Sequence, residues 1–215
     1  MYPEETLLYQ ERTSCLEEFE KYIATQSLQL AHSGEYQHAL SLAESGLSYF
    51  ESTKVKELAT IYRSHLPVSL ANMEVFATDY GMLGTSESRN KYLEDNYGNV
   101  YVSSLSVYQG SITFLSNFKY QTLRGTVAFP KGVTRGGQQI SATLTIYGDG
   151  NQIARFSDVS DTSSPTFFEL SISSYERITM TWECKGANIW HNWGHFATIF
   201  DGAFIPIPLA LPEVA

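Results

Sequence analysis

The sequence has few cysteines and no stretch that is apolar enough to cross a membrane. Its two cysteines, Cys15 and Cys184, lie far apart among 215 residues, so they form neither a disulfide framework nor a metal-binding motif. We expect them to be small buried hydrophobic groups in separate domains, with a bridge between them as the less favoured alternative. The chain has no run of about 18 apolar residues, so membrane insertion is not expected.

Positive charge is also scarce. Charged residues make up 17% of the chain, and the formal net charge is −9. Residues 1–85 hold twelve acidic and five basic side chains, a net charge of −7, and residues 86–215 hold eleven and nine, a net charge of −2. Because neither part carries a basic stripe, nucleic acid is not expected as a partner. The acidic N-terminus lacks the basic and apolar parts of a signal peptide; localisation stays unknown, with the cell exterior or a particle surface favoured over the cytoplasm.

The motifs of common enzyme classes are missing as well. The sequence contains no nucleophile elbow, no P-loop and no dinucleotide-binding fingerprint. No two titratable residues stand in a context that indicates matched acid and base roles, and the C-terminal part is poor in the carboxylates that a glycosidase needs. We therefore predict that the protein is not an enzyme and has no cofactor.

Helical spacing of apolar residues marks the first third of the chain. From Glu4 to about Ala31 they share one stripe, formed by Leu8, Cys15, Leu16, Phe19, Ile23 and Leu30. Gly34 is placed to end this helix in a left-handed conformation. Further helices are predicted over residues 36–49 and 53–66, the latter closed by a proline, and a shorter one over residues 70–80.

Small residues surround the first predicted helical turn, at Ala31, Ala39 and Ala43. The segment from residue 31 to residue 40 resembles the turn of a tetratricopeptide-type helical hairpin, but no second copy follows at the expected period. We interpret residues 1–80 as a helical domain that serves as an adaptor or an oligomerisation element.

The hydrophobic pattern changes to period two after a polar linker at residues 81–91. Alternating runs predict strands at residues 100–102, 112–115, 125–129, 142–147, 152–156, 167–172, 178–182 and 196–204. The segment from Gly148 to Asn151 predicts a tight hairpin turn. The fold class is α+β as a two-domain chain, in which an N-terminal α-helical hairpin or bundle precedes an all-β jelly-roll sandwich over residues 92–206. The proline-rich tail 207–215 is expected to lie extended, docked in the groove of a partner.

The sandwich region resembles the NPCBM-type domain, a carbohydrate-binding module of the galactose-binding-like class. The resemblance covers more than half of the chain and rests, in order, on residues 95–101, 117–127, 144–150, 168–173 and 196–200. It implies a jelly roll that binds a glycan or glycoconjugate. Relatives that bind galactose-type sugars carry an acidic-histidine-tryptophan element before the last strand. Here the segment 190–195 has no acidic residue beside its histidines, which leaves the sugar open.

The residue types in that segment favour a sugar site. Two tryptophans and two histidines lie within six residues, Trp190, His191, Trp193 and His195. An indole face covers the C–H face of a sugar, and imidazoles bond its hydroxyls. We predict that these four residues line a ligand pocket, with Tyr97 and Tyr147 as neighbours if their loops reach the same end. The alternative is that one tryptophan plugs the end of the sandwich and the other packs on aromatic residues.

Metal at His191 and His195 is disfavoured, because Gly194 and the strand context spoil the helical geometry that such a pair needs. A structural calcium ion held by loop carboxylates such as Asp95 or Asp201 is left open.

A second function from another class remains open. The chain would then be a structural or assembly protein of a virion or cell-surface particle, with the sandwich as a protein-interaction or decoration domain. Its partner would be a second copy or a larger protein assembly.

Overall fold

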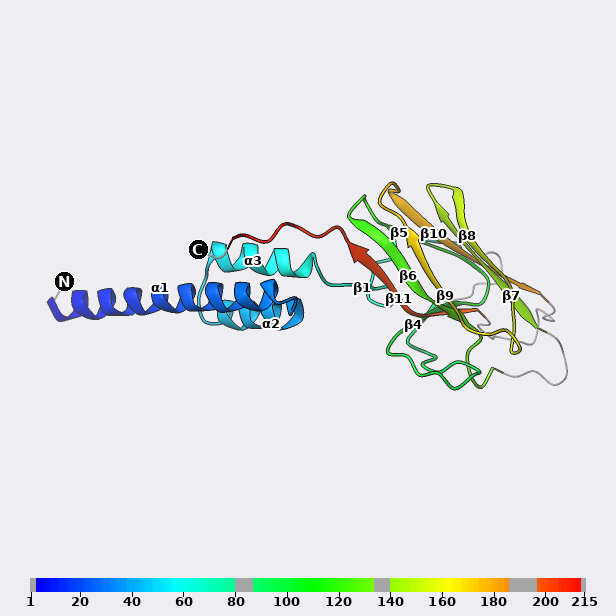
Figure 1. Cartoon of the computed structure of the whole chain (residues 1–215), viewed down its shortest axis with the longest axis horizontal. Coiled ribbons are helices and arrows are strands. Elements are labelled where there is room, and N and C mark those ends of the chain that lie inside the picture. The colour runs from blue at the N-terminus through cyan, green and yellow to red at the C-terminus, as the bar shows by residue number, and fades with distance from the viewer. Residues whose placement is uncertain (1–2, 80–86, 134–139, 186–196, 214–215) are drawn as a thin grey trace. The chain divides into compact units, whose positions relative to one another are not determined.

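The chain folds into two compact units. The computed structural model describes residues 3–79, 87–133, 140–185 and 197–213 (Figure 1). One unit, the helical unit, comprises Met1–Leu66 together with Ile207–Ala215, and the other, the sandwich unit, comprises Pro67–Pro206. In the described part of the chain, no helix is both long and apolar enough to span a bilayer.

Three helices form the helical unit: α1 (Pro3–His32), α2 (Tyr36–Leu47) and α3 (Thr53–Arg63). The turn after α1 contains Gly34, whose φ of +86° is the left-handed conformation that the sequence predicted. Ser52 caps α3, since its hydroxyl accepts a 3.1 Å hydrogen bond from the amide of Val55. The small residues expected where α1 crosses α2 are buried, namely Ala31, Ala39 and Ala43.

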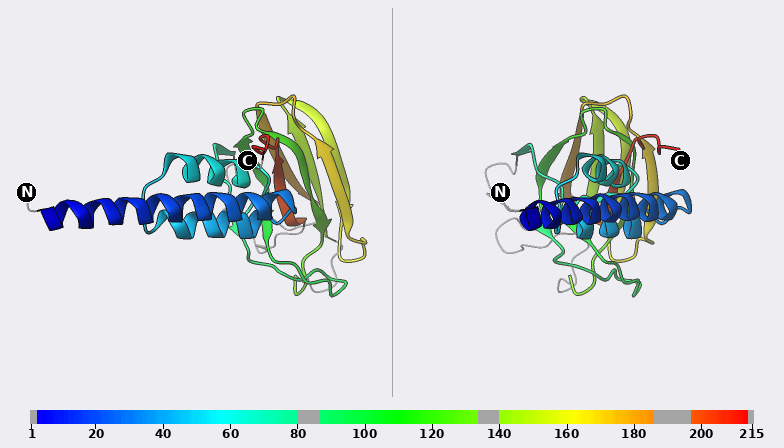
Figure 2. Two further views of the ribbon diagram at one scale, coloured as in Figure 1. Left: turned by 60° about the vertical axis from the view of Figure 1, so that its left-hand side comes forward. Right: turned by 90° about the vertical axis from the view of Figure 1, so that its left-hand side faces the viewer.

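The apolar stripe predicted along α1 is buried only in the second half of the helix. Leu8 is 65% exposed, and Cys15 is exposed rather than buried as expected. Burial begins near Phe19, whose ring meets that of Phe50 edge-on at 5.4 Å. The physical reason is length, because α2 and α3 have 12 and 11 residues against the 30 of α1. Figures 1 and 2 show the first half of α1 extending past both.

Two antiparallel sheets face each other in the sandwich unit. The six-stranded sheet has the order β3 (Glu87–Arg89), β4 (Ser104–Val107), β11 (Thr198–Pro206), β6 (Tyr120–Ala128) and β9 (Thr166–Ser171), with β1 (Val68–Ser69) also pairing with β11. The five-stranded sheet has the order β2 (Ala77–Asp79), β5 (Gly110–Leu115), β10 (Arg177–Lys185), β7 (Ser141–Gly148) and β8 (Asn151–Val159). From β4 to β11 the chain passes from one sheet to the other at every connection except the β7–β8 hairpin, as in a jelly roll, which confirms the predicted fold class.

The core of the sandwich lies between the sheets, and burial alternates along β5 and β10, whereas β7 is buried on both faces. Leu144 and Ile146 of β7, Ile112 and Phe114 of β5 and Trp182 of β10 are fully buried there. The predicted turn after residue 147 joins β7 and β8, with positive φ at Asp149 and Gly150, so the hairpin prediction is confirmed.

The predicted boundary between the domains was wrong. Instead of a fourth helix and a linker, the described residues between 67 and 91 form β1, β2 and β3 of the sandwich unit. Leu70 is buried in the sandwich core, and its amide donates a 2.8 Å hydrogen bond to the carbonyl of Gly202. Pairing of this segment with the sheets therefore outweighs its weak helical pattern, and the helical unit ends at Leu66 rather than at residue 80. Residues 80–86 of the predicted linker lie outside the described residues.

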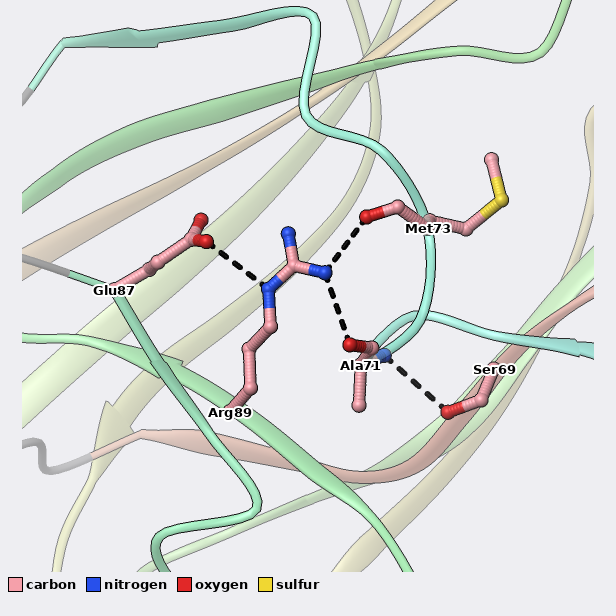
Figure 3. Close-up of polar contacts among 5 residues, drawn as sticks. All are labelled: Ser69, Ala71, Met73, Glu87 and Arg89. Atoms are coloured by element: carbon pink, nitrogen blue, oxygen red, sulfur yellow. Dashed lines mark hydrogen bonds and ion pairs between the residues drawn. The ribbon is translucent and has the colours of Figure 1, made fainter.

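Arg89 of β3 holds the chain between β1 and β2 in place through hydrogen bonds (Figure 3). Its guanidinium donates hydrogen bonds to the carbonyls of Ala71 and Met73, at 2.9 and 2.7 Å, and pairs with Glu87 at 3.0 Å. The amide of Ala71 in turn bonds the hydroxyl of Ser69. One half-buried cation thus satisfies two loop carbonyls and ties the chain between β1 and β2 to β3.

Residues 207–213 of the proline-rich tail form neither helix nor strand and lie against the helices of their own chain. The tail is part of the helical unit, where Leu211 packs against the helical core. The sandwich unit is therefore joined to the helical unit twice, between residues 66 and 67 and between residues 206 and 207.

Candidate functional site

One end of the sandwich gathers several strand ends and loops. Strand β10 ends at Lys185 opposite Ser141, the first residue of β7, and β8 ends at Val159 opposite Ala142. On the other sheet, Thr198 at the start of β11 pairs with Ala128 at the end of β6. We call this the loop end of the sandwich.

A tight hairpin between β3 and β4 lies at the loop end. Glu94 bridges to Val100, and the tip turns through Gly98, whose φ is +87°. The hairpin is joined to the end of β6, because the amide of Asn96 donates a 3.0 Å hydrogen bond to the carbonyl of Phe129. The side chain of Asn96 also bonds the carbonyl of Asp161, in the turn between β8 and β9. Loops from both sheets therefore meet here.

Asp95 organises this hairpin from within. Its side chain is 0% exposed. Oδ1 accepts hydrogen bonds from the amides of Tyr97 and Asn99, at 2.8 and 3.0 Å. Oδ2 accepts from Asn99 Nδ2 and from the hydroxyl of Tyr101, both at 2.8 Å. A buried carboxylate with four donors is fully satisfied, so the hairpin is held in one conformation.

The ionisation of these groups follows from the same contacts. Burial alone would raise the pKa of Asp95, but the hydrogen bonds from Asn99, Tyr101 and Tyr97 outweigh it and lower that pKa. Burial, together with the hydrogen bond to Asp95 and its charge, raises the pKa of Tyr101. Tyr101 also stacks on Phe200 of β11 at 4.4 Å between ring centroids. The pair is therefore a carboxylate and a neutral phenol at neutral pH.

Tyr97 is the predicted site residue that the hairpin presents. The residue is 54% exposed, while its hydroxyl donates a 3.1 Å hydrogen bond to the carbonyl of Thr162. The ring is thus fixed at its backbone by Asp95 and at its tip by the turn between β8 and β9. A half-exposed aromatic ring held at both ends is suited to stacking on a flat apolar ligand face.

Tyr147 does not join it. This residue lies six positions after Ser141 along β7, roughly 20 Å away at the usual rise of a strand. It pairs with Thr179 and Gln152, beside the turn to β8 at the opposite end of the sandwich. The expected grouping of Tyr147 with Tyr97 was wrong, because the turn after Gly148 faces away from the loop end.

The four remaining predicted site residues, Trp190, His191, Trp193 and His195, lie outside the described residues. The described residues nearest to them on either side, Lys185 and Ala197, are at the loop end. The carbonyl of Ala197 accepts a 2.8 Å hydrogen bond from Nε1 of Trp182, which is 1% exposed. This third tryptophan is a core residue that fastens the start of β11 to β10.

The two carboxylates left open as calcium ligands have other partners. Asp201 Oδ1 accepts hydrogen bonds from the amides of Val102 and Ser103, at 3.0 and 2.9 Å. Asp95 faces four donors, so a cation there would meet hydrogens rather than free lone pairs. Within the described ranges, no three histidine, cysteine or acidic side chains cluster as metal ligands would.

Sequence reasoning missed the part that Asp95 plays and the stacking of Tyr101. A signal was present, since an aspartate followed closely by Tyr-Gly-Asn is typical of a turn in which the carboxylate accepts backbone amides. The hydroxyl of Tyr101 and the ring of Phe200 come from outside that turn, so no local pattern predicts their contacts with it.

Solved structures with a fold similar to that of the sandwich unit are known, whereas comparison of the sequence found no match. No protein-family model matches the sequence, and no curated protein matches it. Two similar structures contain the CBM51-2 domain of Clostridium perfringens ZmpB. One, with the M60 catalytic domain and CBM51-1, has a TM-score of 0.54, 13% identity and coverage of 65% of this chain and 15% of that chain. The other, with GlcNAc and INT domains, has a TM-score of 0.52, 13% identity and coverage of 65% and 31%.

A third similar structure is a single module. The CBM51 domain from Clostridium perfringens GH95, solved in complex with methyl-galactose, has a TM-score of 0.52 and 12% identity. The match covers 65% of this chain and 99% of that domain, whereas this chain spans less than a third of the two ZmpB structures. The sandwich unit therefore has the fold of carbohydrate-binding modules.

Proposed function

We propose that this chain is a non-catalytic carbohydrate-binding protein whose sandwich unit holds its ligand at the loop end. The observation that carries the proposal is the ring of Tyr97, half-exposed and fixed by Asp95 and Thr162. The likeness of the fold to modules solved with methyl-galactose and with GlcNAc supports the same ligand class. The sequence resemblance to the NPCBM-type domain agrees with both.

A ring that is already fixed loses little conformational entropy when it binds a sugar. Stacking gains most when the aromatic ring does not have to lose freedom on binding. Tyr97 has lost that freedom already, through a satisfied buried carboxylate and a tip hydrogen bond. In our proposal Trp190 and Trp193 add further stacking faces, and His191 and His195 bond the sugar hydroxyls.

Absence of catalysis is part of the proposal. Asp95 is buried and its lone pairs are taken, so it can neither donate nor accept a proton from a ligand. Purified chain should show no turnover of common glycoside, ester or peptide substrates. A turnover that survives repurification and disappears on a single substitution would refute this part.

A glycan-array screen followed by calorimetry on the best ligand tests the binding. Tyr97→Ala should weaken binding by about 1–3 kcal/mol, the scale for a well-placed aromatic contact. Tyr97→Phe should retain most of the affinity, because the ring remains and only its bond to Thr162 is lost. The proposal fails if the array gives no ligand. It also fails if a glycan binds the Tyr97→Ala chain as tightly as the unaltered chain, and binds as tightly again when Trp190, His191, Trp193 and His195 are all replaced by alanine.

The assembly alternative is favoured by one observation on the helical unit. The exposed first half of α1 carries Leu8, Tyr9 and Leu16, none of which is buried by α2 or α3. Sedimentation of the Leu8→Glu, Leu16→Glu variant beside the unaltered chain tests this role. A defined oligomer that the variant loses supports assembly, and a monomer in both refutes self-assembly through this helix.

A further inference from the structure

The tail is held by the helical unit at a small number of defined points. Leu209 is bound at both of its backbone groups: its amide donates to Ser64 Oγ at 2.9 Å, and its carbonyl accepts from His65 Nε2 at 2.8 Å. His32 Nε2 bonds the carbonyl of Pro212 at 3.0 Å, and the side chain of Leu211 packs on the helical core. We call this arrangement the tail site.

Part of the tail site is held in place by a contact that does not involve the tail. The ring of His65 stacks on Tyr36 at 4.1 Å with an interplanar angle of 10°, which fixes its Nε2 toward the tail. Beyond Pro212 the site continues into a cleft of about 360 Å³ between α1 and α3. Leu28 and Leu58 form part of its apolar floor.

The tail site binds the tail mainly through its backbone, so few of the tail's side chains contribute to recognition. Two carbonyls and one amide are bound, and Leu211 is the anchoring side chain, while the side chains of Ile207 and Leu209 are 45% and 49% exposed. Prolines at positions 206, 208 and 212 favour an extended tail even before it binds, which reduces the entropy lost on docking. The tail is thus a preorganised extended ligand of the helices.

The tail that occupies the tail site could come from the same chain or from a second copy of it. The tail is joined to the last strand of the sandwich, not to the helices that bind it. Exchange of identical segments between copies preserves every contact, so it is a low-cost route to association. We propose that the tail site also accepts residues 207–213 of a second copy, and that chains link through their tails when local concentration approaches the millimolar effective concentration of a short tether.

Cysteine trapping in a Cys15→Ser, Cys184→Ser background tests the proposal in two stages. The double variant Ser64→Cys, Leu209→Cys should first form an intramolecular disulfide, seen as faster migration on a non-reducing gel. Absence of this disulfide would show that the tail does not dock as described, and would overturn the proposal at once.

The second stage mixes two single variants, one with Ser64→Cys and one with Leu209→Cys. A disulfide between them requires the tail of one copy in the tail site of another. We expect a heterodimer whose yield rises with concentration and exceeds, by several-fold, that of a control pair in which exposed Ser48→Cys replaces Ser64→Cys. A synthetic peptide of residues 207–215 should reduce this yield. Heterodimer no greater than in the control pair would mean that the site takes its own tail alone and would refute exchange.

Discussion

Asp95 Oδ2 and the hydroxyl of Tyr101 lie 2.8 Å apart, and this hydrogen bond joins the hairpin to the ring stacked on Phe200. Replacing Asp95 by asparagine keeps one acceptor oxygen but sets an amide group against two donors. Unsatisfied buried donors cost about 1–3 kcal/mol. We therefore expect Asp95→Asn to lower the free energy of unfolding by about that amount at neutral pH, as measured by urea denaturation.

The same group makes stability depend on pH. Because the pKa of Asp95 is lower in the folded chain than in the unfolded one, its contribution is complete above the unfolded value of about 3.9. The contribution is lost as the pH falls from there through the folded pKa. The difference in stability between the unaltered chain and Asp95→Asn should therefore shrink below about pH 4. A difference that stays constant down to the folded pKa would contradict the assignment.

Much of the fold could be predicted from local pattern. Gly34 and the alternation around Leu144 each determine structure through nearest neighbours in the sequence. The segment at residues 67–91 could not be predicted this way. It has a weak helical pattern of its own, and its pairing with other strands makes it part of the sandwich. Strands β2 and β3 pair with β5 and β4, and β1 pairs with β11 more than a hundred residues away, where Leu70 bonds Gly202.

The candidate site shows the same division. Tyr97 could be selected as an exposed aromatic on a turn, but its fixation by Thr162 depends on a loop 65 residues further along the chain. Tyr147 was misplaced because alternation in a strand identifies the face on which a side chain lies and not the end of the sandwich at which its turn falls. Local patterns thus found the residue types, and tertiary contacts decided which of them meet.

The three tryptophans should separate into two groups on substitution. Trp182 is buried and bonds Ala197, so Trp182→Ala should cost about 3–5 kcal/mol of stability. If Trp190 and Trp193 stack on sugar, their alanine variants should lose about 1–3 kcal/mol of binding and melt close to the unaltered chain. Melting temperature and glycan affinity of each variant check this. Normal binding with strongly lowered melting for Trp190 and Trp193 would mark them as core residues.

Close packing at Gly202 gives a prediction for the segment at residues 67–91, which contains Leu70. A Cβ added there would lie 2.6 Å from Cδ1 of Leu70 and 2.8 Å from Cγ2 of Ile199. Overpacking of this kind costs about 1–3 kcal/mol, so Gly202→Ala should lower the melting temperature. The matched test is Leu70→Ala with and without Gly202→Ala: removing the leucine should relieve part of the cost. Equal effects of Gly202→Ala in both backgrounds would show that Leu70 does not pack there.

The boundary between the units can be tested with fragments. A fragment of residues 67–206 retains β1 to β11, the buried Leu70 and the contacts of Arg89, so we expect it to fold alone and to melt cooperatively. A fragment of residues 92–206, the domain that the sequence pattern predicts, lacks β1, β2 and β3. It exposes core around Leu105 and leaves the edge of β5 that pairs with β2 open to other chains. We expect the shorter fragment to aggregate or to melt without cooperativity. Circular dichroism and light scattering of both fragments decide the matter, and a shorter fragment as stable as the longer one would restore the boundary near residue 92.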